Sequence, residues 1–346
     1  MSDGTLLVAT AGQAIMRSAD GGRTWHRLGL RQALEFDAVI RSLCIDPAAP
    51  NVVFAGADVG LCVSRDTGNT WERIDSPFNG QMVWKVAVDP ANSRRIFVGT
   101  GAPSRAALWR TLDGGLTWSK APVEIPEFCA GVNRPRLLAI ALDPADPKQL
   151  WFGLEEGGLF HSRDGGDTWE RVDSRLLYDF HTDIHAIHVL PNHGRKTVVV
   201  VCVNAVYRST DEGANWTGML PNETYGLYYA RALAAPRGSE ATLYLSIADG
   251  TPGTTSRILA THDAGQTWDM QPLPQQPNSC IWAIAANPAD PQRLIAGTKY
   301  GHLFTSTSGG RSWQKQWRDF SEITDVAWSP EVAPIKVAHQ SIAAAV

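Results

Sequence analysis

The sequence predicts an all-β protein, a seven-bladed β-propeller with four antiparallel strands in each blade. Three observations support this prediction. An eight-residue motif of the form S/T-x-D-x-G-x-T-W occurs seven times. The tryptophans that end its copies recur 45 to 52 residues apart, and they are Trp25, Trp71, Trp118, Trp169, Trp216, Trp268 and Trp313. Between the copies, short apolar runs alternate with turn residues without helical periodicity, so each period is one all-β unit that packs against its neighbours.

Each repeat contains four short strands in a fixed order, as residues 40–74 illustrate. An apolar segment at 41–45 ends in an Asp-Pro turn, and a β-branched run follows at 52–55. The segment GLCVS at 60–64 then leads through the motif into TWERI at 70–74. Alternation of apolar runs and turn residues at this length is typical of a four-stranded antiparallel blade. The same cycle restarts at VWKVAVDP, LLAIALDP and IWAIAANP.

The two ends of the chain indicate that the blades close into a ring. ITDVAWSP at 323–330 resembles a first strand, but no second, third or fourth strand follows it. The N-terminal TLLVATAG resembles a second strand without a first. We therefore expect blade 1 to combine both ends, which removes exposed sheet edges. A linear β-solenoid, the competing layout, has shorter repeats. The expected domains are one propeller over residues 1–330 and a C-terminal tail over 331–346.

Charge and hydropathy exclude several classes of partner. The net charge is −4, which offers no electrostatic attraction to nucleic acid or to an anionic membrane. The N-terminus has no basic segment ahead of an apolar run, and the longest apolar stretch, 198–203, is far too short to span a bilayer. The sequence therefore predicts a cytoplasmic protein that binds neither nucleic acid nor membrane.

The repeated motif has a structural explanation. Its aspartate is placed to accept hydrogen bonds from its own turn, its glycine allows a positive φ, and its tryptophan covers the hairpin and packs between blades. With these residues the chain resembles the Asp-box, or BNR-repeat, propellers, which include sialidases, sortilin-type ectodomains, xyloglucan-hydrolysing propellers and photosystem II assembly factors. The resemblance implies structural turns at the blade periphery for Asp20, Asp66, Asp113, Asp164, Asp211 and Asp263. The seventh copy has Ser308 instead, which a turn tolerates more readily than a catalytic set would.

Ligands of propellers gather where the first strands begin, at the mouth of the central channel. Aligning the first strands on their Asp-Pro-like endings gives seven equivalent positions, namely Arg41, Trp84, Leu138, His185, Arg231, Trp282 and Thr324. Arginines favour carboxylates through forked hydrogen bonds, and tryptophans offer flat platforms for sugars or aromatic ligands. With two residues from long neighbouring loops, the predicted ligand-binding residues are Arg41, Trp84, Arg136, Tyr229, Arg231 and Trp282. The alternative is that these side chains pack between blades and pair with neighbours.

The densest polar cluster is FHTDIHAIHVLPNH, which contains the predicted catalytic residues His181, Asp183 and His185. If residues 183–189 form a strand, alternation places these three on one side and His188 on the other. An aspartate beside a histidine suits general acid–base chemistry. The same three residues could instead hold a metal ion, or simply organise the start of the blade. We expect no resident cofactor, with a metal on these three residues as the alternative.

Two functions remain open from the sequence. The first is a binding or assembly module that takes a small molecule, a carbohydrate or a protein partner at the channel mouth. The alternative is an enzyme, a hydrolase or lyase acting on a small anionic or sugar-like substrate. In it, Asp183 and His185 would be the acid–base pair, Arg41 and Arg231 would anchor the substrate, and a metal ion could assist. Sialidase activity is not expected, because the F/Y-R-I-P signature is missing and the ring has seven blades. Xyloglucan hydrolysis in this family normally needs two such propellers, and only one is present.

Overall fold

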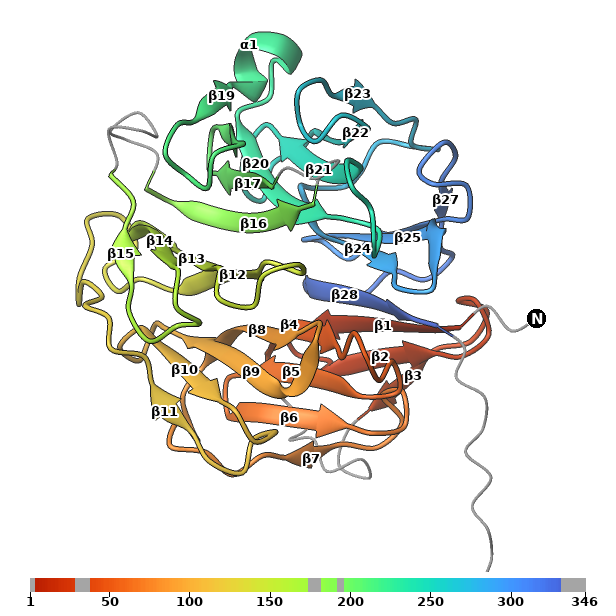
Figure 1. Cartoon of the computed structure of the whole chain (residues 1–346). Helices are drawn as coiled ribbons and strands as arrows, with labels where there is room; N and C mark the ends of the chain where they lie inside the picture. Colours follow the sequence, from red (N-terminus) through yellow and green to blue (C-terminus); the bar gives the residue numbers. More distant parts are fainter. Residues whose placement is uncertain (1–3, 29–37, 174–181, 192–195, 331–346) are drawn as a thin grey trace, which may run out of the picture.

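The computed structural model describes residues 4–28, 38–173, 182–191 and 196–330. These residues form seven separate four-stranded antiparallel sheets arranged as blades around a central axis (Figure 1). The predicted seven-bladed propeller with four strands per blade is confirmed. No helix among the described residues is both long and apolar enough to cross a membrane.

Blades 1 to 4 contain the following strands, in order from the channel outward. Blade 1 is built from β28 (Ile323–Ser329), β1 (Thr5–Thr10), β2 (Ile15–Ser18) and β3 (His26–Leu28). Blade 2 is built from β4 (Ile40–Ile45), β5 (Val53–Ala57), β6 (Gly60–Ser64) and β7 (Glu72–Arg73). Blade 3 is built from β8 (Val83–Asp89), β9 (Asn92–Thr100), β10 (Ala107–Thr111) and β11 (Ser119–Lys120). Blade 4 is built from β12 (Leu137–Leu142), β13 (Leu150–Leu154), β14 (Gly158–Ser162) and β15 (Glu170–Arg171).

Blades 5 to 7 repeat the same order. Blade 5 is built from β16 (Ile184–Leu190), β17 (Thr197–Cys202), β18 (Val206–Ser209) and β19 (Thr217–Met219). Blade 6 is built from β20 (Tyr229–Ala234), β21 (Leu243–Ala248), β22 (Ser256–Thr261) and β23 (Asp269–Met270). Blade 7 is built from β24 (Ile281–Asn287), β25 (Asp290–Thr298), β26 (Leu303–Ser306) and β27 (Gln314–Lys315).

One short helix, α1 (Pro221–Tyr225), lies in the connection from blade 5 to blade 6. Proline at the start of the helix suits a position whose N–H has no intrahelical partner. Gly226 ends the helix at a φ of 66°, and its N–H donates to the Asn222 carbonyl at 3.1 Å. A single turn is too short to produce the apolar periodicity by which helices are recognised in a sequence.

The ring closes through the two ends of the chain, as the sequence predicts. Strand β28 pairs antiparallel with β1, with Leu6 opposite Trp328 and Val8 opposite Val326 (Figure 1). Strand β28 also contacts β24 of blade 7 and β4 of blade 2, so the innermost strands form an unbroken circle. Every inner strand therefore has a neighbouring blade on both sides.

The apolar core lies between neighbouring blades. The motif tryptophan Trp25, for example, packs in one cluster with Leu6 and Val8 of its own blade and with Ile295 and Leu303 of blade 7. Its indole nitrogen donates to the Gly22 carbonyl at 3.0 Å, which anchors the ring to the turn it belongs to. The motif thus joins a local turn to the packing between blades.

Close contact between blades depends on glycines in four of the second strands. A Cβ added to Gly153 would lie only 2.3 Å from Cγ2 of Ile184, the first residue of the next blade. The same relation, at 2.5 to 2.7 Å, joins Gly56 to Val83, Gly99 to Leu137 and Gly297 to Ile323. At the equivalent place between blades 5 and 6 the sizes are reversed, because Val201 packs in one cluster with Ala230. Each contact therefore combines one small residue with one branched residue.

The Asp-box turns show the hydrogen bonds that a structural role requires. Asp20 accepts from the backbone N–H of Thr24 at 2.9 Å, from the hydroxyl of Thr24 at 2.6 Å and from the hydroxyl of Ser18 at 2.8 Å. A corresponding set of bonds occurs at Asp66, Asp113, Asp164, Asp211 and Asp263. In the seventh turn the hydroxyl of Ser308 accepts from the N–H of Ser312 at 2.9 Å. The turns join third and fourth strands at the outside of each blade, away from the channel.

We expect the Asp20 turn to lose its stabilising effect in acid. Hydrogen bonds from Thr24 lower the pKa of Asp20 to about 2, against about 3.9 in an unfolded chain. A carboxyl with a lowered folded-state pKa stabilises the fold above the unfolded pKa and ceases to do so as pH falls through the folded pKa. The side chain is largely exposed, so Asp20→Asn should cost only about 0.5–1 kcal/mol at pH 7. Urea unfolding should show this difference disappearing between about pH 4 and pH 2.

The seventh turn provides the control for this prediction. Ser308→Ala removes a comparable hydrogen-bond acceptor without removing a titratable group. The stability difference between Ser308→Ala and the wild type should therefore not depend on pH over this range. A pH-independent difference for Asp20→Asn would contradict the prediction.

Candidate functional site

A β-bulge occurs near the start of every first strand. At each bulge the register between the first and second strands shifts by one residue, as between Ile184 and Ala186 of β16. The residues within the seven shifts are Arg41, Trp84, Leu138, His185, Arg231 with Ala232, Trp282 and Thr324. These include all seven positions that the sequence alignment singled out. A bulge re-aims the side chain it carries, and this directs one residue from each blade into the channel.

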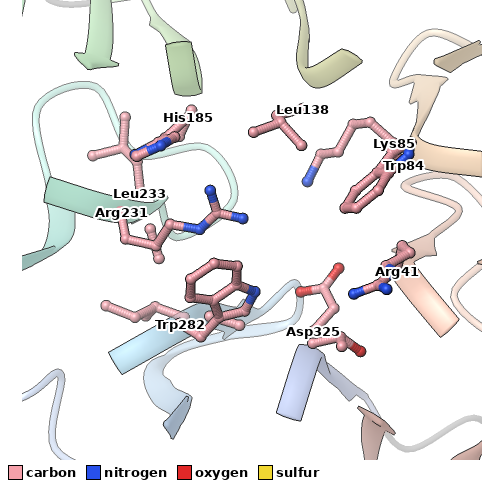
Figure 2. A pocket seen from close by; sticks show the side chains of 14 residues that line it. Arg41, Trp84, Lys85, Leu138, His185, Arg231, Leu233, Trp282 and Asp325 are labelled. Atoms are coloured by element: carbon pink, nitrogen blue, oxygen red, sulfur yellow. The ribbon is translucent and has the colours of Figure 1, made fainter. Parts of the chain in front are cut away.

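The seven bulge positions line one cavity of about 110 Å³ at the mouth of the channel (Figure 2). The structure therefore brings together residues that lie up to 283 positions apart in the chain, from Arg41 to Thr324. Two further polar residues of this cavity, Lys85 and Asp325, were missed by the sequence analysis. Each directly follows a bulge position, where strict strand alternation predicts a side chain on the opposite face. A bulge interrupts the alternation, so two consecutive residues can reach the same cavity.

Two arginines lie beside Trp84, which is on one side of the mouth. The guanidinium carbon of Arg41 is 4.7 Å from the centre of the Trp84 ring, and that of Arg136 is 4.9 Å from it. The Trp84 indole nitrogen donates to the Ala102 carbonyl at 3.0 Å and fixes the ring. Arg136 does not line the cavity and forms an ion pair with Glu155 at 2.6 Å. Of the two arginines, Arg41 is thus the one available to a ligand.

Trp282 repeats this arrangement in blade 7. The guanidinium carbon of Arg231 lies 3.8 Å from the centre of the Trp282 ring, and Nζ of Lys299 lies 4.2 Å from it. Lys299 forms an ion pair with Glu322 at 2.8 Å. In Figure 2 the guanidinium of Arg231 points into the cavity between Trp282 and His185. Each tryptophan therefore holds one cation at the cavity and lies near a second that is already paired.

Positive charge exceeds negative charge in this cavity. Among the described residues, Arg41, Lys85 and Arg231 have neither a hydrogen-bond acceptor nor an ion-pair partner, and Nε of Arg41 is buried without one. The carboxylate in the lining is Asp325, which accepts from the backbone N–H groups of Leu43 at 2.8 Å and Val326 at 2.9 Å. Burial raises the pKa of the Asp325 carboxyl, and the nearby Lys85 opposes that rise. Three unpaired cations around one carboxylate favour an anionic ligand.

The predicted acid–base pair is largely engaged within the protein. The side chain of His185 is only 2% exposed; its Nδ1 lies 2.7 Å from the Ala230 carbonyl oxygen and its Nε2 lies 3.4 Å from Oδ1 of Asp183. Both ring nitrogens thus face acceptors, and the first of these contacts joins blade 5 to blade 6. Tyr229 is buried beside this ring, at 5.3 Å between ring centres, and does not line the cavity; burial raises the pKa of its hydroxyl. The arrangement fits the alternative in which this segment organises the start of the blade.

Three further predictions concern the segment around His185, namely a catalytic role for His181, the position of His188 and a metal site. His181 lies outside the described residues. His188 lines a separate cavity farther along the channel, whereas His185 lines the channel-mouth cavity. Within the described ranges, no three His, Cys, Asp or Glu residues are grouped so that they could hold a metal ion. A metal site that includes His181 stays a prediction.

The closed ring, the repeated turns and the channel-mouth cavity define this chain as an Asp-box β-propeller. Residues 59–178 match the family model described as Sortilin-Vps10, for sortilin and neurotensin receptor 3. Xyloglucanase Xgh74A of Acetivibrio thermocellus is 27% identical over 321 residues, which cover 77% of this chain and 37% of that enzyme. The photosystem II assembly lipoprotein Ycf48 of Synechococcus sp. (strain CC9902) is 23% identical over 248 residues, covering 68% of this chain and 66% of Ycf48.

Solved structures show the same fold. The GH74 enzyme of Niastella koreensis has a TM-score of 0.62 at 22% identity, covering 80% of this chain and 45% of that one. A structure of YCF48 bound to a D1 peptide has a TM-score of 0.52 at 16% identity, covering 81% and 82% of the two chains. The chain spans only 37 to 38% of the length of the first xyloglucanases that it matches. The likeness therefore extends to xyloglucanases and to an assembly factor alike.

Proposed function

We propose that this propeller is a binding module that captures a carboxylate group of a protein partner at its channel mouth. The observation that carries the proposal is the set of three cations, Arg41, Lys85 and Arg231, that share one cavity and have no hydrogen-bond or ion-pair partner among the described residues. Three cations that face a pocket with a single carboxylate in its described lining, Asp325, are stabilised when a further carboxylate enters, through charge-assisted hydrogen bonds. Arg41 and Arg231 are also held in place by stacking on Trp84 and Trp282, so little side-chain entropy is lost on binding.

The size of the cavity and its surroundings favour a peptide group. A cavity of about 110 Å³ can hold a single acidic side chain or the carboxylate end of a chain, but it is too small for a larger ligand. Phe128, Tyr228 and Tyr300 are 57%, 52% and 55% exposed, and they lie in loops at the end of the blades where the first strands begin. Exposed aromatic residues around a charged pocket are typical of protein interfaces. The solved YCF48, a propeller of similar fold, carries a D1 peptide, which supports a partner of this kind.

The proposal is tested by titrating three short capped peptides into the protein. One ends in a free α-carboxylate, the second carries a glutamate side chain and an amidated end, and the third carries glutamine and an amidated end. We expect binding of the first or second peptide and none of the third. Shifts of the indole N–H NMR signals of Trp84 and Trp282 report the contact. Arg231→Gln or Arg41→Gln should weaken binding by about tenfold or more, because each removes a charge-assisted hydrogen bond.

A matched control comes from the outside of blade 4. Arg163 forms an exposed ion pair with Glu170 at 2.8 Å, far from the channel, so Arg163→Gln removes the same charge without touching the cavity. Affinity should be unchanged in this variant. Equal affinity for all three peptides, or equal losses in the cavity and control variants, would overturn the proposal. The peptide that binds also decides between a chain end and an acidic side chain.

An enzymatic function is the second candidate, and the similarity to Xgh74A favours it. Glycoside hydrolysis needs two carboxyl groups that flank the scissile bond. Asp183 lies beside His185 and does not line the cavity, which leaves Asp325 as the carboxyl in the cavity lining. Release of reducing ends from xyloglucan, with loss of activity in Asp325→Asn, would support this candidate. Absence of turnover in a protein that binds the peptides would remove it.

A further inference from the structure

A second cavity, the distal cavity, lies farther along the channel, beyond the channel-mouth cavity. It has a volume of about 480 Å³, and most of its wall is apolar. The wall consists of the later residues of the first strands, among them Leu43, Val86, Ile140, Leu142, Ile187 and Val189. The turns that end these strands form its rim, with Pro47, Pro90, Pro144 and Pro191. A mostly apolar cavity of this size matches the usual dimensions of small-molecule sites.

The charges that line the distal cavity are all positive. They belong to Lys85 and Arg237, and no aspartate or glutamate is found among the described lining residues. Arg237 is exposed, and its guanidinium donates to the Pro47 carbonyl at the rim. Burial lowers the pKa of His188 to about 4 and raises the pKa of Cys44 to about 11, so both side chains are neutral at pH 7. An anionic group would therefore meet no carboxylate in the described lining itself, although Asp46 and Asp325 are near enough to act on Cys44.

Lys85 has a special position, because it lines both the distal cavity and the channel-mouth cavity. Lys85 belongs to β8 and lies between the two cavities along the channel. Its ammonium group points into the channel (Figure 2). Within the described part of the chain, Nζ of Lys85 makes no hydrogen bond and no ion pair. The inner end of an apolar cavity thus carries an ammonium group that has no direct ion pair with the described residues, although Asp325 lies close enough to interact with it electrostatically. Lys85 is half-buried, and a carboxylate that enters the distal cavity can pair directly with its ammonium group.

We propose that the distal cavity binds an aliphatic carboxylate, with its alkyl chain against the first strands and its carboxylate on Nζ of Lys85. The alkyl chain leaves water for the apolar wall, which supplies the affinity. The carboxylate pairs with the ammonium group, which supplies selectivity over neutral and cationic amphiphiles. This site shares Lys85 with the proposed peptide site but lies in a different cavity, because Arg41 and Arg231 do not line the distal cavity.

The experiment titrates three ten-carbon probes into the full chain by calorimetry: decanoate, decanol and decyltrimethylammonium. Decanoate should bind more tightly than the other two. Lys85→Met keeps most of the aliphatic stem and removes the charge, so it should weaken decanoate binding by about tenfold or more and leave decanol unchanged. Ala141→Trp fills the cavity from β12 and should remove binding of both probes. Val189→Phe, from β16, is the second blocking variant if Ala141→Trp does not fold.

Two matched measurements separate this proposal from the peptide site. Arg231→Gln should leave decanoate binding unchanged, and acetate should bind far more weakly than decanoate. Equal affinity for acetate and decanoate, or loss of decanoate binding in Arg231→Gln but not in Ala141→Trp, would assign the carboxylate to the channel mouth and overturn the proposal. Undiminished decanoate binding in Lys85→Met would overturn it as well.

Discussion

Removal of β28 should abolish folding of the propeller. A chain that ends at Glu322 lacks the innermost strand of blade 1, which pairs with β1 along its whole length. It also loses Ile323, Val326 and Trp328, which are at most 3% exposed in the core between blades 1 and 7. Each such side chain stabilises the fold by about 1.5–3 kcal/mol, against a total stability of about 5–15 kcal/mol for a domain. Circular dichroism and size-exclusion chromatography should show an unfolded or aggregated product.

A chain that ends at Pro330 is the control. It keeps β28 complete, so its thermal midpoint should equal that of the full chain. This control also tests the proposal that residues 331–346 are a tail outside the propeller. A chain ending at Glu322 with the same midpoint as the longer forms would contradict the closure argument.

Gly153→Ala should destabilise the protein by about 1–3 kcal/mol, as overpacked cores do. The added methyl group would lie 2.3 Å from Cγ2 of Ile184 and 2.6 Å from its Cβ. Ile184 is fully buried at the start of β16, and its Cβ is fixed by the backbone, so the side chain cannot simply rotate away. Blades 4 and 5 must therefore move apart. The free energy of unfolding in urea measures the cost.

A double-mutant cycle provides the control for this prediction. Ile184→Ala alone leaves a cavity and should cost about 2–5 kcal/mol. In Gly153→Ala with Ile184→Ala, the new methyl group occupies space that the isoleucine has vacated, so the combined cost should be smaller than the sum of the single costs. The native pair of Val201 and Ala230 already shows a small residue on the later blade. If the losses in free energy of unfolding are simply additive in the double variant, residues 153 and 184 do not contact each other and the prediction is wrong.

The fold could be predicted from the sequence because the signal is local and repeated. The hydrogen bonds that Ser18, Asp20 and Trp25 make within their Asp-box turn all lie within eight residues, so the motif is visible without the fold. Alignment of the first strands also identified the seven mouth positions, because six of the strands have the same length between the bulge and the proline of the terminal turn, and the strand of blade 6 is one residue shorter. Lys85 and Asp325 were missed, since alternation assigns them to the wrong face and no local signal reveals a bulge. That the residues at the channel mouth bind a ligand stays a prediction.

The sequence by itself determined the number of blades, the strands of each blade, the closure by both ends and the one bulge position that each blade contributes to the mouth. Only the tertiary structure decided which charges are neutralised. Arg136 is paired with Glu155 and Lys299 with Glu322, while Arg41, Lys85 and Arg231 share a cavity without partners among the described residues. The physical reason is that pairing depends on distances between side chains of different blades, and these distances follow from the packing of seven sheets into one ring. The apolar distal cavity, with Lys85 at its inner end, arises from the same packing.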